Sequence, residues 1–148
     1  MKRPIALVSL AVAVVAVVAG AGIATGQSLY GKYLTVADVE KATGLSRLAG
    51  REVAITLEFY DAKGTKIVDV RFDRPSSWDQ EVERNKSLYE TVPGIGEKAA
   101  IAIPAMPYRV TLVKGNYCVM IQSVPVNGKV PLTKDQLLAL ARVVASRL

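Results

Sequence analysis

The sequence predicts an α+β fold: a single antiparallel β-sheet of about five strands, packed by N- and C-terminal helices and preceded by an apolar N-terminal helix. Two stretches, 51–72 and 108–123, alternate polar and apolar residues with the period of two that half-buried strands show. A short turn sequence interrupts each stretch, so each predicts an antiparallel hairpin. Capped helical sequences stand before the first stretch and after the second, which predicts helices that pack on the sheet.

Residues 1–26 have the layout of an export signal. Lys2 and Arg3 precede an uncharged run, Pro4–Gly31, that is rich in alanine and valine. The range 19–26 holds two sets of small residues at the spacing that a signal peptidase accepts. This arrangement predicts a cleaved signal peptide.

An uncleaved membrane anchor is the alternative for the same segment. As a helix, 5–23 is long enough to approach the thickness of a bilayer core of about 30 Å. Lys2 and Arg3 keep the N-terminus inside in both cases, so both alternatives predict that residues 34–148 form an exported domain. The domain would be periplasmic, extracellular, or anchored to the outer side of the cytoplasmic membrane by its N-terminal segment.

The first predicted helix covers 36–43. Thr35 suits its N-terminal cap and Gly44 follows its last residue. The first predicted hairpin comes next, with a turn at Asp61–Gly64. The alternating apolar residues of its first strand are Val53, Ile55, Leu57 and Phe59. Those of its second strand are Val68, Val70 and Phe72.

The stretch after this hairpin predicts a peripheral helix. Ser76 or Ser77 caps its start, and it ends near Val92 because Pro93 disfavours helical geometry in the preceding residue. Its apolar stripe is thin, so we expect the helix to be partly exposed. The stripe consists of Trp78, Val82, Asn85 and Tyr89.

The second hairpin turns at Gly115-Asn116, a pair typical of two-residue reversals. Its second arm, from Tyr117, is apolar on both faces, which predicts a central strand. Thr133 and Gln136 then form a capping box for a last helix over 134–147. The predicted core face of this helix consists of Leu137, Leu140, Ala141 and Val144.

The stretch "TVPGIGEKAAIAIPAMPY" has two incompatible interpretations. In one, Gly94, Ile95, Gly96 and Lys98 belong to a helix-hairpin-helix turn whose amides grip a nucleic-acid backbone. In the other, the glycines form a turn that leads into a strand over 99–103. A proline directly after that range limits a second helix to about two turns, so the strand is favoured.

Four stretches stand out together: "YLTVADVEKATGL", "VPGIGEKA", "VTLVKGNYCVMI" and "LTKDQLLALARVVASRL". Together they resemble a group of small exported bacterial domains, many of them lipoproteins of unknown function, whose fold is compared with the photosystem-associated PsbP family. The resemblance covers Leu34 to Leu148 and implies a sheet with the last helix lying across it. It implies no catalytic residues. The chain differs from the lipoprotein members because it lacks a lipid-accepting cysteine.

The composition argues against an enzyme. The chain has no histidine, which is the commonest general base and metal ligand in proteins. Its one cysteine, Cys118, lies in an apolar run and is predicted to be buried and inert. Glu58 and Asp69 are expected to face each other across the first hairpin as part of a solvated surface. No catalytic residue, metal or cofactor is predicted.

A small exported domain without catalytic groups predicts a binding function. We expect a non-catalytic envelope protein that serves as a binding or accessory subunit for a protein partner or a larger membrane or extracellular assembly. The predicted partner-binding residues are Trp78, Tyr89, Met106 and Tyr108. The alternative is a membrane-tethered DNA-binding protein that uses Gly94, Ile95, Gly96 and Lys98. The basic residues of this sequence are scattered along the chain, which favours a protein partner over nucleic acid.

Overall fold

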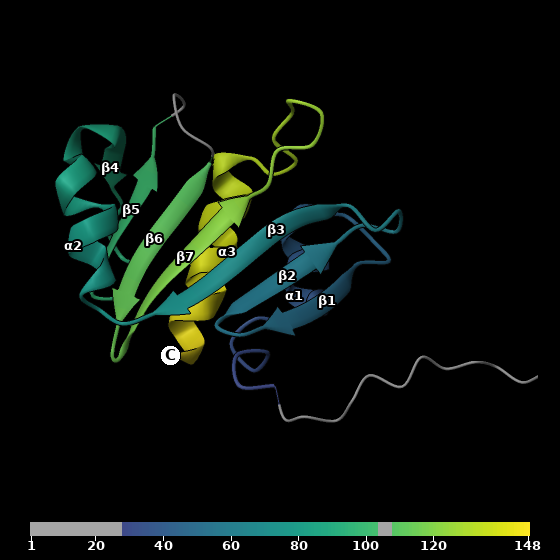
Figure 1. Cartoon of the computed structure of the whole chain (residues 1–148), viewed down its shortest axis with the longest axis horizontal. Helices are drawn as coiled ribbons and strands as arrows, with labels where there is room; N and C mark the ends of the chain where they lie inside the picture. Colours follow the sequence, from purple (N-terminus) through teal and green to yellow (C-terminus); the bar gives the residue numbers. More distant parts are fainter. Residues whose placement is uncertain (1–27, 104–107) are drawn as a thin grey trace, which may run out of the picture.

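The computed structural model describes residues 28–103 and 108–148, and these fold around one antiparallel β-sheet with helical elements on both faces (Figure 1). In this part of the chain the sheet has seven strands, in the spatial order β1-β2-β3-β7-β6-β5-β4. The strands are β1 (Ala49–Val53), β2 (Thr56–Tyr60), β3 (Lys66–Asp73), β4 (Tyr89–Thr91), β5 (Lys98–Ala102), β6 (Arg109–Lys114) and β7 (Tyr117–Ser123). The helical elements are α1 (Val36–Thr43), α2 (Ser77–Glu81), the 3-10 helix η1 (Glu83–Leu88) and α3 (Lys134–Arg147).

The predicted α+β class with a single antiparallel sheet is confirmed. The sheet consists of two meanders, β1-β2-β3 and β4-β5-β6-β7, which meet where β3 pairs with β7. Strand β7 lies between β3 and β6, as its apolar residues on both faces predict. The helix predicted for the N-terminal residues and the predicted site residue Met106 lie outside the described ranges.

The main core lies between the sheet and the pair α1 and α3. Helix α3 packs against β6, β7 and α1, and it lies behind the sheet in the view of Figure 1. The predicted core face of α3 is confirmed, because all four of its residues are fully buried. Thr35 and Thr133 cap the two helices as predicted, and Gly44 ends α1 in the left-handed conformation. The capping box predicted at Thr133 is present, and Thr35 forms a second one with Asp38.

The prediction of one strand through Val53, Ile55 and Leu57 is wrong. The chain reverses at Ala54 and Ile55, so Val53 pairs with Thr56 and two strands form where one was expected. Ala54 adopts the turn with φ of 52°, although it is neither glycine nor asparagine. Across this two-residue turn, residues of opposite parity share a face, so Val53 lies on the polar face with Thr56 and is 44% exposed, while Leu57 is buried. The alternation continues unbroken in the sequence, and therefore the pattern alone does not reveal the reversal.

The prediction of one helix from Ser76 to Val92 is also wrong. Helix α2 is short, η1 follows it, and the last residues form β4, in which Tyr89 pairs with Ala102. The break falls at Asn85, whose backbone is non-helical and whose side-chain amide donates to the carbonyls at the end of α2. Ser76 makes no side-chain cap. Strands β1 and β4 therefore raise the number of strands above the predicted five.

An aromatic cluster closes the core at the end where the described chain begins. The ring of Phe72 stacks on Tyr30 with 4.6 Å between centroids, and it also contacts Tyr33 and Tyr117. The two N-terminal tyrosines are half-buried in these contacts. Residues 28–33 are thus packed onto β3 and β7.

Candidate functional site

The face of the sheet opposite α3 is covered over only half of its width. Helix α2 and the 3-10 helix η1 pack over β4, β5, β6 and the adjoining part of β7, whereas no described helix packs over this face of β1, β2 and β3 (Figure 1). Strand register places a row of polar residues directly across the uncovered half. We call the polar side chains on this half the open face, and they are Arg51, Thr56, Glu58, Tyr60, Lys66, Asp69, Arg71, Asp73 and Gln122.

Arg109 marks the border between the covered and open halves. Its guanidinium donates to the Glu81 carboxylate of α2 at 3.0 Å and to the Gln122 amide oxygen at 2.9 Å. On the covered side, Trp78 and Val82 pack against β5, β6 and β7 in a second, smaller apolar cluster. The open half therefore begins where the polar row replaces this cluster.

Glu58 is the centre of the charged network on the open face. Its carboxylate accepts hydrogen bonds from the Tyr60 hydroxyl at 2.6 Å and from Arg51 at 2.7 Å, and Lys66 lies at 3.2 Å. These hydrogen bonds, from Tyr60 first and then Arg51, lower the pKa of Glu58 to about 2. The predicted pairing of Glu58 with Asp69 across the hairpin is confirmed, and Lys66 contacts both carboxylates.

Replacing Glu58 with glutamine is expected to lower the free energy of unfolding by about 1–2 kcal/mol at neutral pH, since it removes charge-assisted hydrogen bonds. The pKa of Glu58 is lower in the folded chain than its ordinary value of 4.5. Its contribution is therefore complete above about pH 4.5 and disappears as the pH falls through about 2. Urea unfolding at several pH values measures the difference in the free energy of unfolding between the wild type and Glu58→Gln.

The difference should shrink only within that acidic window. Tyr60→Phe is the matched control, because it removes the strongest donor and keeps the ring. It should raise the pKa of Glu58, as read from the carboxyl carbon in an NMR titration. A pH-independent difference between wild type and Glu58→Gln would contradict the described network.

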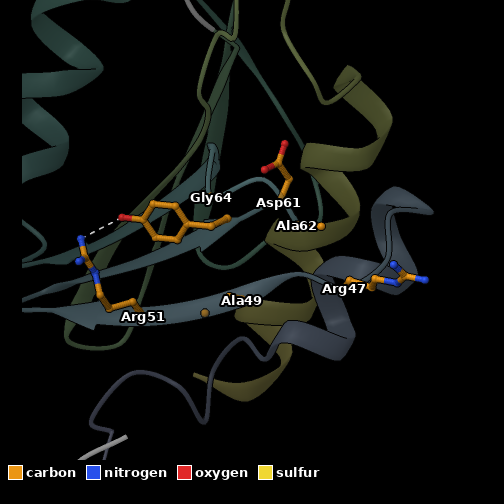
Figure 2. Close-up of a pocket in the computed structure, with 8 residues that line it drawn as sticks. Arg47, Ala49, Arg51, Asp61, Ala62 and Gly64 are labelled. Carbon is orange, nitrogen blue, oxygen red and sulfur yellow. Dashed lines mark hydrogen bonds between the residues drawn. The ribbon is translucent and has the colours of Figure 1, made fainter. Parts of the chain in front are cut away.

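A shallow groove of about 530 Å³ adjoins the open face at its outer edge, between β1 and the turn after β2 (Figure 2). Figure 2 shows Arg51 and Arg47 at its two ends, with Ala49 between them. The Asp61 carboxylate accepts from the backbone amides of Lys63 and Thr65 at 2.9 Å, so it is committed to the turn. The full lining is Arg47, Ala49, Gly50, Arg51, Tyr60, Asp61, Ala62 and Gly64.

Two cations of the groove differ in their partners. Arg51 is engaged by Glu58 and by the Tyr60 hydroxyl, which it reaches at 2.9 Å. Arg47 is exposed, and within 28–103 and 108–148 its side chain forms no ion pair or hydrogen bond. The groove thus offers one guanidinium without a partner in the described chain, an aromatic ring and a floor of small residues. This arrangement is suited to a carboxylate or to an extended polypeptide.

The predicted partner-binding residues are not brought together as one exposed patch. Trp78 is only 5% exposed, its indole N–H donates to Glu83, and the amine of Lys98 lies 4.6 Å from its ring centroid. Tyr89 is half-buried against the same apolar cluster. Tyr108 instead packs against the main core. The burial of Trp78 shows that it fills the edge of the fold beneath α2.

The helix-hairpin-helix interpretation of the glycine stretch is wrong. Strands β4 and β5 flank the turn where that motif requires two helices, and the predicted strand over 99–103 is confirmed within one residue. Ile95 is 1% exposed and belongs to the main core. Gly94 and Gly96 both have positive φ, at 76° and 61°, and they shape a turn that returns the chain to the sheet.

Cys118 is buried as predicted, and burial raises the pKa of its thiol to about 11. We therefore expect alkylation by iodoacetamide at pH 8 to be at least ~100-fold slower in the folded chain than in urea, because a stability of about 5 kcal/mol keeps open forms rare. Mass spectrometry of timed samples measures both rates. Equal rates in the two conditions would contradict the burial of β7.

The described ranges hold neither a metal-binding cluster nor a membrane-spanning helix. No group of three histidine, cysteine, aspartate or glutamate side chains is placed to hold a metal ion between residues 28–103 and 108–148. Of the helices that the structure describes, none is both long and apolar enough to span a bilayer.

Comparison with known proteins gave no match: no family model, no curated protein and no solved structure matches the chain. The resemblance to exported PsbP-like domains accordingly stays a prediction. Sequence reasoning did not find the groove, because its outer wall is β1, which was expected to be part of a longer strand. The cluster of Arg47 and Arg51 around Gly50 was the available signal.

Proposed function

We propose that the chain is a non-catalytic exported domain that binds a protein partner through its open face and groove, as an accessory subunit of an assembly in the cell envelope or outside the cell. The observation that carries this proposal is the half-covered sheet. A second helical layer covers β4, β5 and β6, whereas the same face of β1, β2 and β3 carries mostly polar side chains.

A solvated polar face is common in antiparallel sheets and does not by itself imply a partner. The groove distinguishes this face from plain solvated surface. It combines arginine and tyrosine, which are enriched in protein interfaces, with small residues that allow a backbone to approach closely. Strand β1 is also an edge of the described sheet, so its outer backbone groups are available to an extended segment of a partner.

The ionisable groups of the site support a non-catalytic role. A general acid or base works best with a pKa near the operating pH. The pKa of Glu58 is about 2, so its carboxylate stays charged at neutral pH. The chain also has no histidine.

The test is the size of the assembly that contains the full chain in the cells that produce it, measured by native electrophoresis of gently solubilised extracts. Two variants change the groove: Arg47→Glu reverses its unpaired charge, and Ala49→Trp fills its floor. Arg142→Glu is the matched control, because Arg142 is equally exposed but lies on α3. We expect both groove variants to shift the chain to a smaller species, while the control stays in the assembly.

Retention of the assembly by both groove variants would contradict the proposal. So would turnover of a substrate by the purified domain that a point change at one polar residue abolishes.

A further inference from the structure

Three exposed aliphatic side chains lie at the end of the molecule where the described chain begins. Leu29 is 67% exposed, Val53 is 44% exposed and Ile55 is 38% exposed. The last two flank Ala54 in the turn between β1 and β2, where polar residues or glycine are usual. We call these three residues the apolar tip.

Hydrogen bonds and ring stacking place Leu29 beside the β1–β2 turn, which carries Val53 and Ile55. The Glu52 carboxylate accepts from the backbone amides of Leu29 and Tyr30, each at 3.1 Å. Tyr30 stacks on Phe72, and the amide of Phe72 donates to the carbonyl of Ile55 at 2.8 Å. Leu29 is therefore fixed beside the β1–β2 turn. Figure 1 shows this turn and the start of the described chain at the same end of the molecule.

Only a short segment of the chain connects the apolar tip to the apolar N-terminal segment. The uncharged run 5–23 is separated from Leu29 by residues 24–28 alone. Six residue steps, fully extended, reach at most about 20 Å. The polar interface of a bilayer is itself roughly 5–8 Å deep on each side. A retained anchor thus keeps the apolar tip close to the membrane surface.

We infer that in the form that keeps residues 1–26 the apolar tip docks into the lipid interface and fixes the orientation of the domain on the membrane. This inference rests on the proposed export of the domain and on retention of its N-terminal segment. Docking buries aliphatic side chains that are otherwise in water, and the tether keeps them at high local concentration near the lipid.

The inferred orientation leaves the partner site free. The groove lies at the Asp61–Gly64 turn, which is at the opposite end of β2 from Ile55. The groove then points away from the membrane, and the open face stands beside it. A partner in the envelope would reach both without displacing lipid.

The test uses the full chain reconstituted in phosphatidylcholine vesicles, with a nitrobenzoxadiazole fluorophore on one introduced cysteine. Ile55→Cys places the label at the apolar tip, and Lys63→Cys, at the exposed turn beside the groove, is the control. The buried Cys118 is not labelled in the folded chain. Nitroxide-bearing lipids then quench a label that lies in the interface.

We expect several-fold stronger quenching and a blue-shifted emission for the label at Ile55 compared with Lys63. Adding Val53→Asp to the Ile55→Cys chain should abolish the difference, which separates docking from mere closeness to the anchor. Equal quenching at both positions, or quenching that Val53→Asp leaves unchanged, would overturn the inference. Those results would leave the groove-dependent assembly untouched, so failure of docking is distinguishable from failure of the proposed function.

Discussion

Gly96→Ala is expected to lower the free energy of unfolding by about 3 kcal/mol, the larger loss of the two glycines in this turn. Gly96 has φ of +61°, and a Cβ at this position would lie 2.6 Å from the carbonyl oxygen of Val113. The same oxygen accepts the amide of Glu97 at 2.8 Å, so the turn cannot move away without losing a backbone hydrogen bond. The left-handed backbone costs an alanine about 1–2 kcal/mol, and overpacking adds roughly 1–3.

Gly94→Ala is the matched control in the same turn. Gly94 has φ of +76°, but no atom lies within 4 Å of a Cβ built there. Only the backbone penalty applies, so we expect a loss of about 1 kcal/mol. Urea unfolding at 25 °C, followed by far-UV circular dichroism, measures both variants. Equal losses would show that the close approach of Gly96 to β6 is wrong.

Phe72→Ala is the second large effect, with an expected loss of about 4 kcal/mol in the free energy of unfolding. Phe72 is 1% exposed, and its ring contacts Tyr30, Tyr33 and Tyr117 at the end of the core. Truncating a buried phenylalanine removes its transfer free energy and leaves a cavity, which together cost about 3–5 kcal/mol. The segment 28–33 should also loosen, because Phe72 is the ring on which it packs.

Phe59→Ala is the control that separates the loss of global stability from the loosening of segment 28–33. Phe59 is 2% exposed and belongs to the same core, yet it contacts none of these tyrosines through ring packing. Both variants should lower global stability, but only Phe72→Ala should speed hydrogen exchange at the Tyr33 amide, which is bonded to the carbonyl of Tyr30. Unchanged exchange at Tyr33 in Phe72→Ala would contradict the described packing of the N-terminal segment.

Local signals predicted the helices α1 and α3 and the β6–β7 hairpin. Capping boxes and a terminal glycine act within one helical turn, and the Gly115-Asn116 reversal needs two residues only. The central place of β7 also follows from its own composition. These features are encoded where they occur, so a single sequence is sufficient to predict them.

The incorrect predictions concern segments whose structure is determined by tertiary contacts and not by local sequence. Ala54 turns the chain with positive φ although nothing in its type requires it, and β2 then pairs on both sides. The predicted single helix is interrupted at Asn85, and the residues from Tyr89 form a strand because Tyr89 pairs with Ala102. The open face depends on the pairing of β3 with β7, two strands far apart in sequence. Its position was therefore beyond the reach of sequence patterns.

The role of the site residues also depends on tertiary contacts that the local sequence does not reveal. Aromatic residues on a thin stripe predicted an exposed patch, but Trp78 is buried because the sheet edge offers it an apolar floor. In the sequence, Arg47 and Arg51 do not differ from ordinary surface charges. Their importance comes from the separate strand β1, which places them at the two ends of one groove.

The most direct test of the open face as a partner site is photocrosslinking in the cells that produce the protein. A benzoylphenylalanine residue at Arg71, on the open face, or at Arg47, in the groove, reports any protein within contact distance. The same residue at Arg142, on the outer side of α3, is the control. We expect one defined crosslinked partner from the first two positions and none from the third. The same products from all three positions, or products from Arg142 alone, would contradict the assignment of the partner site to the open face.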